Sequence, residues 1–363
     1  MSLVLDMVGK TVGEEMHLED ISLTLEPGRL YVLLGPTLAG KTTLMRIMAG
    51  LERPTGGRVL EGGIDVTRVS VRKRSVAMVY QQFVNYPPLT VYENIASPLR
   101  IAGLPRPEID RRVREMARML HIEELLDRLP AQLSGGQQQR CAIARALVKQ
   151  ARLLLLDEPL VNLDFKLREE LRVELRDLFA RQETTVVYAT TEPLEALMMG
   201  GEVIVLDQGR LLQTGPTAEV YHRPGTTAVA RVFSDPPMNL VRVAVRNGVA
   251  VAPGGLHVPL RAHLAHLPDG RHTFGVRAAH LSTRRRGEED LEIPTEVTLA
   301  EVSGSETFVH VHHGGVDWVV QEEGVHEYAL GEPLRIYLDP AHLYAFDHLG
   351  VLEAAPAVAT ERR

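Results

Sequence analysis

Residues 35–43 read GPTLAGKTT and constrain the fold more than any other stretch of the chain. The apolar run LYVLL precedes them at 30–34, and the helical pattern TLMRIMAGL follows. This order of strand, glycine-bounded turn and helix matches the phosphate-binding loop G-x-x-x-x-G-K-[ST]. We therefore predict that backbone N–H groups of the turn and helix start form an anion site at the end of a buried strand. The predicted phosphate-contacting residues are Gly35, Pro36, Thr37, Leu38, Ala39, Gly40, Lys41, Thr42 and Thr43.

The residue types of this loop suit phosphate binding. Gly40 lets the backbone approach phosphate oxygens because it carries no Cβ. Lys41 supplies a point charge for β- and γ-phosphates, and the Thr42 hydroxyl is placed to ligate Mg²⁺. A tight connection without a ligand is the alternative interpretation. The loop by itself indicates a nucleotide phosphate and says little about purpose.

Composition argues against several classes of function. The net charge is −7, so the chain as a whole has no electrostatic preference for nucleic acid or anionic membranes. The single cysteine, Cys141, cannot form an internal disulfide, and its helical context predicts a small buried side chain. The start MSLVLDMVGK lacks the features of a signal peptide, and no apolar run approaches the roughly 18 residues that span a bilayer. A membrane role would therefore require a partner.

The distribution of patterns predicts an α/β core with a helical insertion, followed by a second domain. Strand and helix patterns alternate over residues 1–234, which predicts a mostly parallel sheet, and helical patterns dominate at about 87–144. Short alternating runs such as VRVAV and LRIYL fill 235–353, which predicts an all-β regulatory domain of one or two OB-like barrels. Residues 354–363 are predicted to be a disordered tail.

Two further stretches carry chemistry. The apolar run LLLLDEP at 153–159 ends in Asp157, which can hold Mg²⁺, and Glu158, which can polarise an attacking water as general base. A helix cap is the alternative interpretation, and it loses weight behind a phosphate loop. The run LSGGQQQR opens a helix and offers a second anion-binding N-terminus, with an ordinary N-cap as the alternative. Its candidate nucleotide-binding residues are Ser134, Gly135, Gly136 and Gln137.

The order of these motifs produces a specific resemblance. A phosphate loop, the glutamine Gln81 after a strand, LSGGQ, LLLLDEP and NLD at 162–164 follow one another as in the ATP-binding-cassette (ABC) ATPases, which the chain resembles from residue 3 to about 234. The resemblance implies a P-loop NTPase core that binds ATP and Mg²⁺. It also implies that two cassettes meet head to tail, with each ATP between one phosphate loop and the other cassette's LSGGQ.

The same resemblance implies roles for individual residues. Val12 occupies the position that contacts adenine, and Asp164 resembles the residue that communicates across the dimer. Residues 86–95 resemble the surface that grips the cytoplasmic coupling helices of a transmembrane subunit. The catalytic positions are Glu158, Gln81 and Thr191, and the metal positions are Thr42, Gln81 and Asp157.

The β-rich part resembles the regulatory domain of the MalK-like importer ATPases, through DPPMNL at 235–240, FGVRAAHL at 274–281, SGSETFV at 303–309 and LDPAHLYAFD at 338–347. This resemblance implies uptake of a sugar, a polyol such as glycerol, or a glycerol phosphate. The implied partners are a second ABC ATPase, two transmembrane permease subunits and, indirectly, an external solute-binding protein, at the cytoplasmic face of the inner membrane. No nucleic-acid partner is expected, because the chain has neither a second cassette nor a basic stripe.

Three positions depart from the family pattern. Leu38 stands where glycine is usual, Val12 where an aromatic residue stacks on adenine, and Thr191 where a histidine contacts the γ-phosphate. Valine offers no π-face and threonine no imidazole. We therefore expect this chain's own ATP site to be slow, in a heterodimer with a more ordinary ATPase as in two-ATPase glycerol importers. The alternatives are a homodimer in which Glu158 suffices, and a nucleotide-gated regulatory subunit with little turnover.

Overall fold

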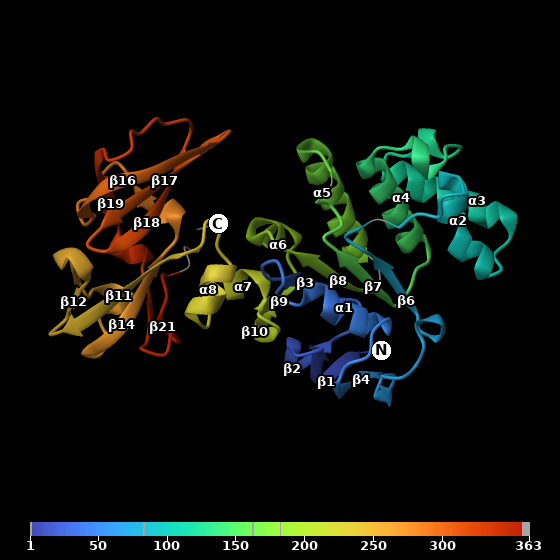
Figure 1. The fold of residues 1–363 in the computed structure, drawn as a ribbon, viewed down its shortest axis with the longest axis horizontal. Helices are drawn as coiled ribbons and strands as arrows, with labels where there is room; N and C mark the ends of the chain where they lie inside the picture. The colour runs from blue at the N-terminus through green and yellow to red at the C-terminus, as the bar shows by residue number, and fades with distance from the viewer. Residues whose placement is uncertain (1, 83, 162, 182, 358–363) are drawn as a thin grey trace. The chain divides into compact units, whose positions relative to one another are not determined.

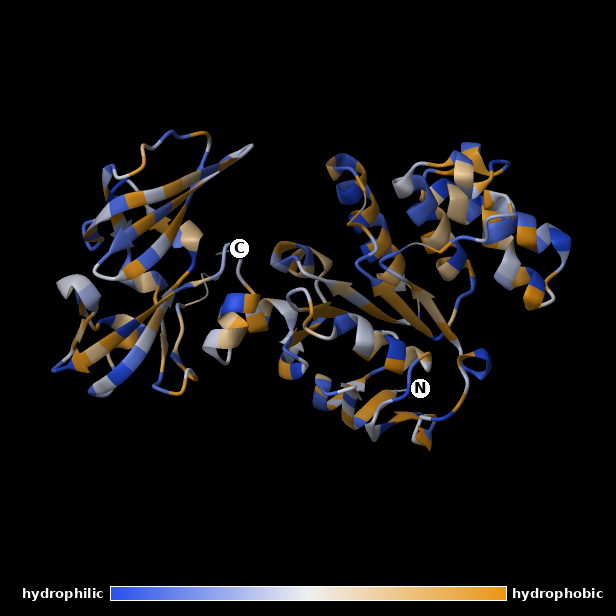
Figure 2. Cartoon of the chain, in the orientation of Figure 1, coloured by the Kyte–Doolittle hydropathy of each residue, from blue (hydrophilic) through white to orange (hydrophobic). Residues whose placement is uncertain are grey.

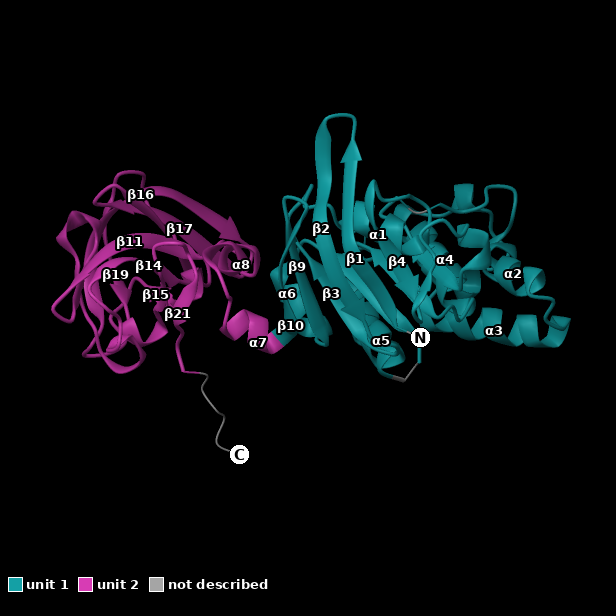
Figure 3. Ribbon diagram, turned by 90° about the horizontal axis from the view of Figure 1, so that it is seen from below, with its two compact units in different colours: residues 1–217 teal, residues 218–363 magenta. Residues whose placement is uncertain are grey.

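The computed structural model describes residues 2–82, 84–161, 163–181 and 183–357, without the side chain of Arg181. Asn162 of the NLD stretch and the last six residues of the chain, 358–363, lie outside the described part. The chain divides into two compact units, residues 1–217 and 218–363 (Figure 3).

The second unit begins before the sequence-based limit at residue 234. The short helices α7 (Thr217–His222) and α8 (Thr227–Val232) precede that limit. The N–H of Thr227 donates to the carbonyl of Gly350 at 2.9 Å, which attaches α8 to the all-β unit. This attachment explains why the structural division falls earlier than the change in sequence pattern.

Unit 1 is a mixed α/β unit, as the sequence predicts. Its helices are α1 (Lys41–Ala49), α2 (Val91–Ile101), α3 (Arg106–Met119), α4 (Gly135–Val148), α5 (Phe165–Arg181) and α6 (Pro193–Met199). Its strands are β1 (Leu3–Val12), β2 (Glu15–Leu25), β3 (Leu30–Leu34), β4 (Gly56–Glu61), β5 (Ile64–Asp65), β6 (Val76–Val79), β7 (Leu153–Asp157), β8 (Thr185–Thr190), β9 (Glu202–Asp207) and β10 (Arg210–Pro216).

The larger sheet of unit 1 has the order β10-β9-β3-β8-β7-β6. The pairs from β9 to β6 are parallel, and only β10 runs antiparallel to its neighbour β9. The prediction of a mostly parallel sheet is therefore confirmed. Because parallel strands end at the same edge, the loops after β3, β8, β7 and β6 emerge side by side, where ligands of such sheets bind.

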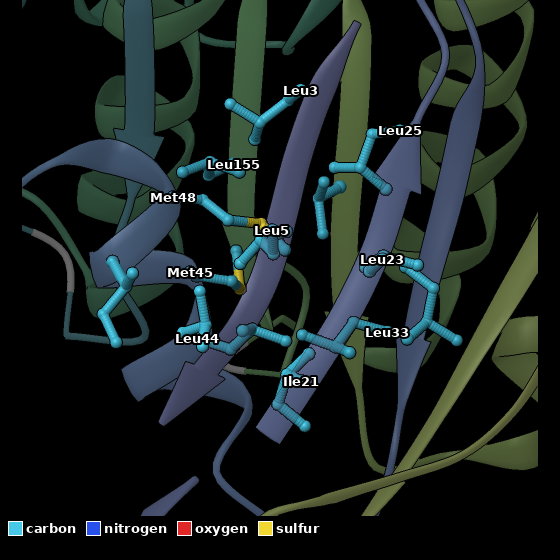
Figure 4. Close-up of a cluster of buried hydrophobic side chains, with 14 of the residues drawn as sticks. Leu3, Leu5, Ile21, Leu23, Leu25, Leu33, Leu44, Met45, Met48 and Leu155 are labelled. Carbon is cyan, nitrogen blue, oxygen red and sulfur yellow. The ribbon is translucent and has the colours of Figure 1, made fainter. Parts of the chain in front are cut away.

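A second, antiparallel sheet of order β2-β1-β4-β5 covers the core of unit 1. Side chains from both sheets and from α1 fill one hydrophobic cluster (Figure 4). Leu5, Ile21, Leu33 and Met45 within it are at most 1% exposed. The sequence predicts strands in this region but not their separation into a second sheet.

The helical insertion consists of α2, α3 and α4, which contact one another (Figure 1). A capping box starts α2, because the Thr90 hydroxyl accepts from the Glu93 N–H and the Glu93 carboxylate accepts from the Thr90 N–H. The last helix, α4, continues to Val148, slightly beyond the expected limit at residue 144.

Unit 2 is all-β apart from α7, α8 and short 3₁₀ turns, and the predicted change of fold class is confirmed. Its sheets have the orders β13-β12-β11-β14-β20-β21 and β15-β19-β16-β17-β18. Hydrophobic and hydrophilic residues alternate along several of these strands (Figure 2), and inward side chains such as Val243, Ile293 and Trp318 form one core. The strands are β11 (Asn239–Arg246), β12 (Val249–Val251), β13 (His257–Pro259), β14 (Gly270–Val276), β15 (Leu281–Ser282), β16 (Leu291–Ser303), β17 (Glu306–His313), β18 (Val316–Glu323), β19 (Pro333–Leu338), β20 (Tyr344–Phe346) and β21 (Leu352–Ala354).

The expected tail begins at Ala354, but this residue is 5% exposed and pairs with Ala345 in the sheet. Among the described residues, no helix is both long and apolar enough to cross a bilayer.

The core of unit 1 generates a stability prediction. Leu33→Ala is expected to lower the free energy of unfolding by about 2–5 kcal/mol, because Leu33 is fully buried and the change leaves a cavity. Leu194→Ala is the matched control, since Leu194 is 61% exposed, and it is expected to change stability by less than about 0.5 kcal/mol. Denaturant unfolding measures both, and equal effects would contradict the assigned core.

Candidate functional site

Four loops at the carboxyl edge of the larger sheet converge on one site. The loop after β3 leads into Lys41, the first residue of α1, while the loop after β6 carries Gln81 and the loop after β7 carries Glu158. The adjacency of β3, β8, β7 and β6 also brings Thr191, after β8, to this edge. The structure thus brings together residues that lie about 150 positions apart in the chain.

Lys41 is the buried cation of the site. Its Nζ donates to the carbonyl oxygens of Gly35 at 2.8 Å and Pro36 at 3.0 Å, and it lies 3.5 Å from Glu158 Oε1. Burial lowers the pKa of Lys41, and the Glu158 carboxylate counteracts that effect. A loop that folds its own lysine inward keeps a positive charge at its centre, where an anion would bind.

The loop backbone takes left-handed conformations at Gly40 and Leu38. Gly40 has φ 99°, and a Cβ there would lie 2.8 Å from the carbonyl oxygen of His17, so only glycine fits. Leu38 has φ 68° and is 95% exposed, so its side chain points away from the loop. Leucine in place of the usual glycine therefore strains the backbone at this position, but its side chain does not enter the loop.

Thr42 and Asp157 form the candidate metal position. The Thr42 hydroxyl donates to Asp157 Oδ2 at 2.7 Å. Burial raises the pKa of Asp157, and the Thr42 hydrogen bond and the charge of Lys41 oppose this effect. A hydroxyl and a carboxylate oxygen are the hard ligands that Mg²⁺ prefers, so the donor set fits the predicted ion.

Glu158 is half-buried beside this position, and its backbone is held in an unusual conformation. Its φ is 47°, and its N–H donates to the carbonyl of Ala189 at 3.1 Å. The Gln81 side chain donates to Glu158 Oε2 at 3.0 Å. The Glu158 carboxylate is thus oriented by Gln81 and Lys41.

Thr191 lines a small pocket together with Glu158. The preceding residue, Thr190, donates its hydroxyl to the buried Glu195, which also accepts from the Tyr188 hydroxyl at 2.6 Å. Burial raises the pKa of Glu195. This network fixes the end of β8, so Thr191 is held at the edge of the site on a rigid segment.

The LSGGQ segment starts α4 at a separate place. The Ser134 hydroxyl accepts from the Gln137 N–H at 3.4 Å, and the Gln137 side chain accepts from the Ser134 N–H at 3.0 Å. The N-cap interpretation is thus correct, and it is compatible with anion binding because Gly135 is exposed. Among the described residues, no hydrogen bond joins Ser134–Gln137 to the phosphate loop.

Two more predicted residues lie at the periphery. Asp164 caps α5, because its Oδ1 accepts from the Leu167 N–H at 3.0 Å, and it is exposed. Val12 ends β1 and is 49% exposed. In the predicted permease-facing segment 86–95, Tyr86 is 47% exposed, and the Arg145 guanidinium lies 4.7 Å from the centre of its ring.

Sequence reasoning missed Gln139 and Glu195, two buried polar residues behind the site. The Gln139 amide donates to the carbonyl of Pro159, and Glu195 anchors the end of β8 as described. In the sequence, the only indication of a role for these residues was a polar side chain on an otherwise apolar helix face. Cys141 nearby is fully buried, as predicted, and burial raises its pKa to about 12.

Two family models match parts of this chain. A family model described as ABC transporter matches residues 18–161, and one described as TOBE domain matches residues 274–346. The first match spans Lys41, Gln81, Ser134 and Glu158, and the second lies in unit 2.

Curated relatives extend over almost the whole chain. The sn-glycerol-3-phosphate import ATP-binding protein UgpC of Cupriavidus pinatubonensis is 38% identical over 359 residues, which cover 95% of this chain and 97% of that protein. UgpC 3 of Rhizobium etli is 41% identical and covers 85% of each chain. The trehalose/maltose import ATP-binding protein MalK of Thermococcus litoralis is 37% identical, and the match covers 94% of this chain and 96% of that protein.

Among solved structures, the dimer of the ATP-binding cassette MJ0796 in a post-hydrolysis state with ADP and phosphate matches with a TM-score of 0.55 and 31% identity. The match covers 59% of this chain and 98% of that cassette. A whole cassette fold is therefore contained in this chain.

The Thr42–Asp157 pair generates a binding prediction. Asp157→Asn is expected not to lower the stability of the nucleotide-free protein, because burial already disfavours the ionised carboxylate. The variant is expected to lose the stabilisation by Mg²⁺ with ATP, about 2.7 kcal/mol at a ligand concentration 100 times Kd, because an anionic oxygen is lost. Thermal unfolding with ATP, with and without Mg²⁺, measures this effect.

Asp177→Asn is the matched control, since Asp177 is exposed on α5. If Mg²⁺ with ATP stabilised Asp157→Asn as strongly as the wild type, the assignment of Asp157 to the metal would be wrong.

Proposed function

This chain belongs to the ABC transporter family of ATP-binding proteins, and from that premise we propose that it hydrolyses ATP to drive solute uptake through membrane partners. The observation that carries the proposal is the cluster at the carboxyl edge of the larger sheet. There the Lys41 ammonium lies 3.5 Å from the Glu158 carboxylate, and the Thr42 hydroxyl donates to Asp157. A cation and a hydroxyl at the start of α1, beside two carboxylates at the end of β7, are groups that phosphoryl transfer uses.

In the proposed reaction, the N–H groups of the loop and Lys41 bind the phosphates of ATP. Lys41 exchanges its two carbonyl partners for phosphate oxygens. Glu158 accepts a proton from the attacking water, and Gln81 orients that carboxylate by the hydrogen bond at 3.0 Å. Thr42, Asp157 and Gln81 would hold Mg²⁺, which when bound neutralises charge on the phosphates.

The second half of each ATP site would come from another cassette. The helix start at Ser134–Gln137 is exposed at Ser134 and Gly135 and lies apart from this chain's own phosphate loop, and a related cassette is solved as a dimer. We assign Ser134, Gly135, Gly136 and Gln137 to the partner's nucleotide, and the exposed Asp164 to contact across the dimer.

The proposed partners are two transmembrane permease subunits and, indirectly, an external solute-binding protein, with the chain peripheral at the cytoplasmic face of the inner membrane. The exposed segment at Tyr86 is the proposed permease contact. The relatives are named for import of sn-glycerol-3-phosphate and of trehalose or maltose. We therefore propose a glycerol phosphate, a polyol such as glycerol, or a sugar as the solute.

Thr191 favours a second candidate function, a nucleotide-binding regulatory subunit paired with a more active ATPase. A threonine can donate one hydrogen bond but cannot align water and γ-phosphate as an imidazole does. Val12 adds to this argument, because it offers adenine no aromatic face. In the proposed heterodimer, this chain's own site binds ATP and turns over slowly, and its LSGGQ completes the faster site of the partner.

Glu158→Gln tests the proposed reaction. It is expected to lower ATP turnover by at least about 100-fold, because the general base is lost, and to accumulate an ATP-bound dimer. Phosphate release and size-exclusion chromatography with Mg²⁺ and ATP measure both. Glu183→Gln, an exposed residue at the opposite edge of the sheet, is the control. Unchanged turnover in Glu158→Gln would refute the role of Glu158.

Thr191→His separates the two candidate functions. It is expected to raise single-turnover ATP hydrolysis at this chain's own site about 10-fold or more, because an imidazole can align the water. Thr184→His places the same side chain at the other end of β8 and is expected to have no effect. Brisk turnover by the unmodified chain as a homodimer would instead support the view that Glu158 suffices.

A further inference from the structure

We propose that Gln139 is a positioning residue, which fastens the backbone turn that carries Glu158 to the helix that starts at the LSGGQ segment. The proposal rests on the proposed ATPase function. It concerns two residues, Gln139 on α4 and Pro159 directly after Glu158, that no sequence motif connected.

The contact is buried and specific. Gln139 is 0% exposed, and its Nε2 donates to the carbonyl oxygen of Pro159. Its Oε1 has no hydrogen-bond partner among the described residues. An unpaired buried acceptor costs free energy, so an amide is an unfavourable choice for a purely structural position. The apolar neighbours Cys141 and Ile143 show that α4 is otherwise packed by non-polar groups.

The turn at Glu158 needs support because of its backbone conformation. Glu158 has φ 47°, a region that side-chain-bearing residues rarely occupy, and such strain persists only where neighbours over-determine it. On one side, its N–H donates to Ala189 on β8 at 3.1 Å. On the other side, Gln139 holds the carbonyl of the next residue. The turn is therefore fixed between β8 and α4.

A second path links α4 to the same carboxylate. The Asn85 side chain donates to the carbonyl of Gln138 at 2.8 Å, and Gln81, four positions before Asn85, donates to Glu158. Helix α4 thus contacts the turn after β7 through Gln139 and contacts Asn85 through Gln138, while Gln81 contacts Glu158 in that turn. A displacement of Ser134–Gln137 upon binding the partner's nucleotide would reach Glu158 through Gln139, two residues further along α4.

Gln139→Met tests the proposal, because methionine has a similar volume and no hydrogen-bond donor. The full-length chain is compared with the wild type in ATP hydrolysis with Mg²⁺, under single-turnover conditions that detect a slow site. The rate is expected to fall about 10- to 100-fold, because a misplaced base weakens catalysis. The ATP concentration for half-maximal rate and the Tm are expected to be unchanged.

Hydrogen exchange supplies a readout that does not depend on ATP hydrolysis. Amide exchange in the segment after β7 is expected to rise in Gln139→Met, while exchange within β7 stays unchanged. Cys141→Ala is the matched control, because it alters a fully buried residue of the same helix for which the described part of the chain shows no hydrogen bond to the turn. Gln139→Leu replaces the methionine variant if that variant does not fold.

The outcomes are distinct. A wild type without ATP hydrolysis would refute the proposed function, and hydrogen exchange would still test the fastening of the turn. A Gln139 variant with wild-type rate and wild-type exchange overturns the positioning role. An equal loss of rate in Cys141→Ala, or a loss of folding in both Gln139 variants, also overturns it, because the effect would then be general to the helix core.

Discussion

A buried ammonium at the end of a parallel strand is the interaction on which unit 1 depends. Lys41 reaches back to the carbonyl oxygens of its own loop and to Glu158, so strand β3, helix α1 and strand β7 meet around one charge. Burial of this charge is tolerated because the oxygens of the loop and the carboxylate surround it. Phosphate oxygens can replace these oxygens around Lys41. The contacts that stabilise the buried charge therefore occupy the position where a phosphate would bind.

The sequence predicts this part of the molecule well because its determinants are local. The turn at Gly40 admits only glycine, and the strand before Asp157 is apolar and short, so each motif encodes its own conformation. Their convergence then follows from the rule that parallel strands end at one edge. The division into an antiparallel and a parallel sheet was not predictable in this way, because β-strand pairing depends on partners that are distant in the chain.

The residues that sequence reasoning missed have the same explanation. Gln139 and Glu195 matter through what they touch, Pro159 and Thr190, and a single polar residue in an amphipathic pattern carries no sign of its contact. The placement of α8 with unit 2 is a similar case, since the hydrogen bond from Thr227 to Gly350 spans more than a hundred residues. The sequence alone identified Leu38 as a departure from the usual glycine. Only the structure explains why the loop accommodates a leucine, because the side chain is exposed.

The interior position of Cys141 has a practical consequence. It is the single cysteine of the chain, it is fully buried, and burial raises the pKa of its thiol to about 12. Thiolate is the reactive form, so this side chain stays inert toward maleimides near neutral pH. A cysteine introduced at any surface position can therefore receive a fluorophore or spin label alone, with the native sequence otherwise intact, for distance measurements between cassettes.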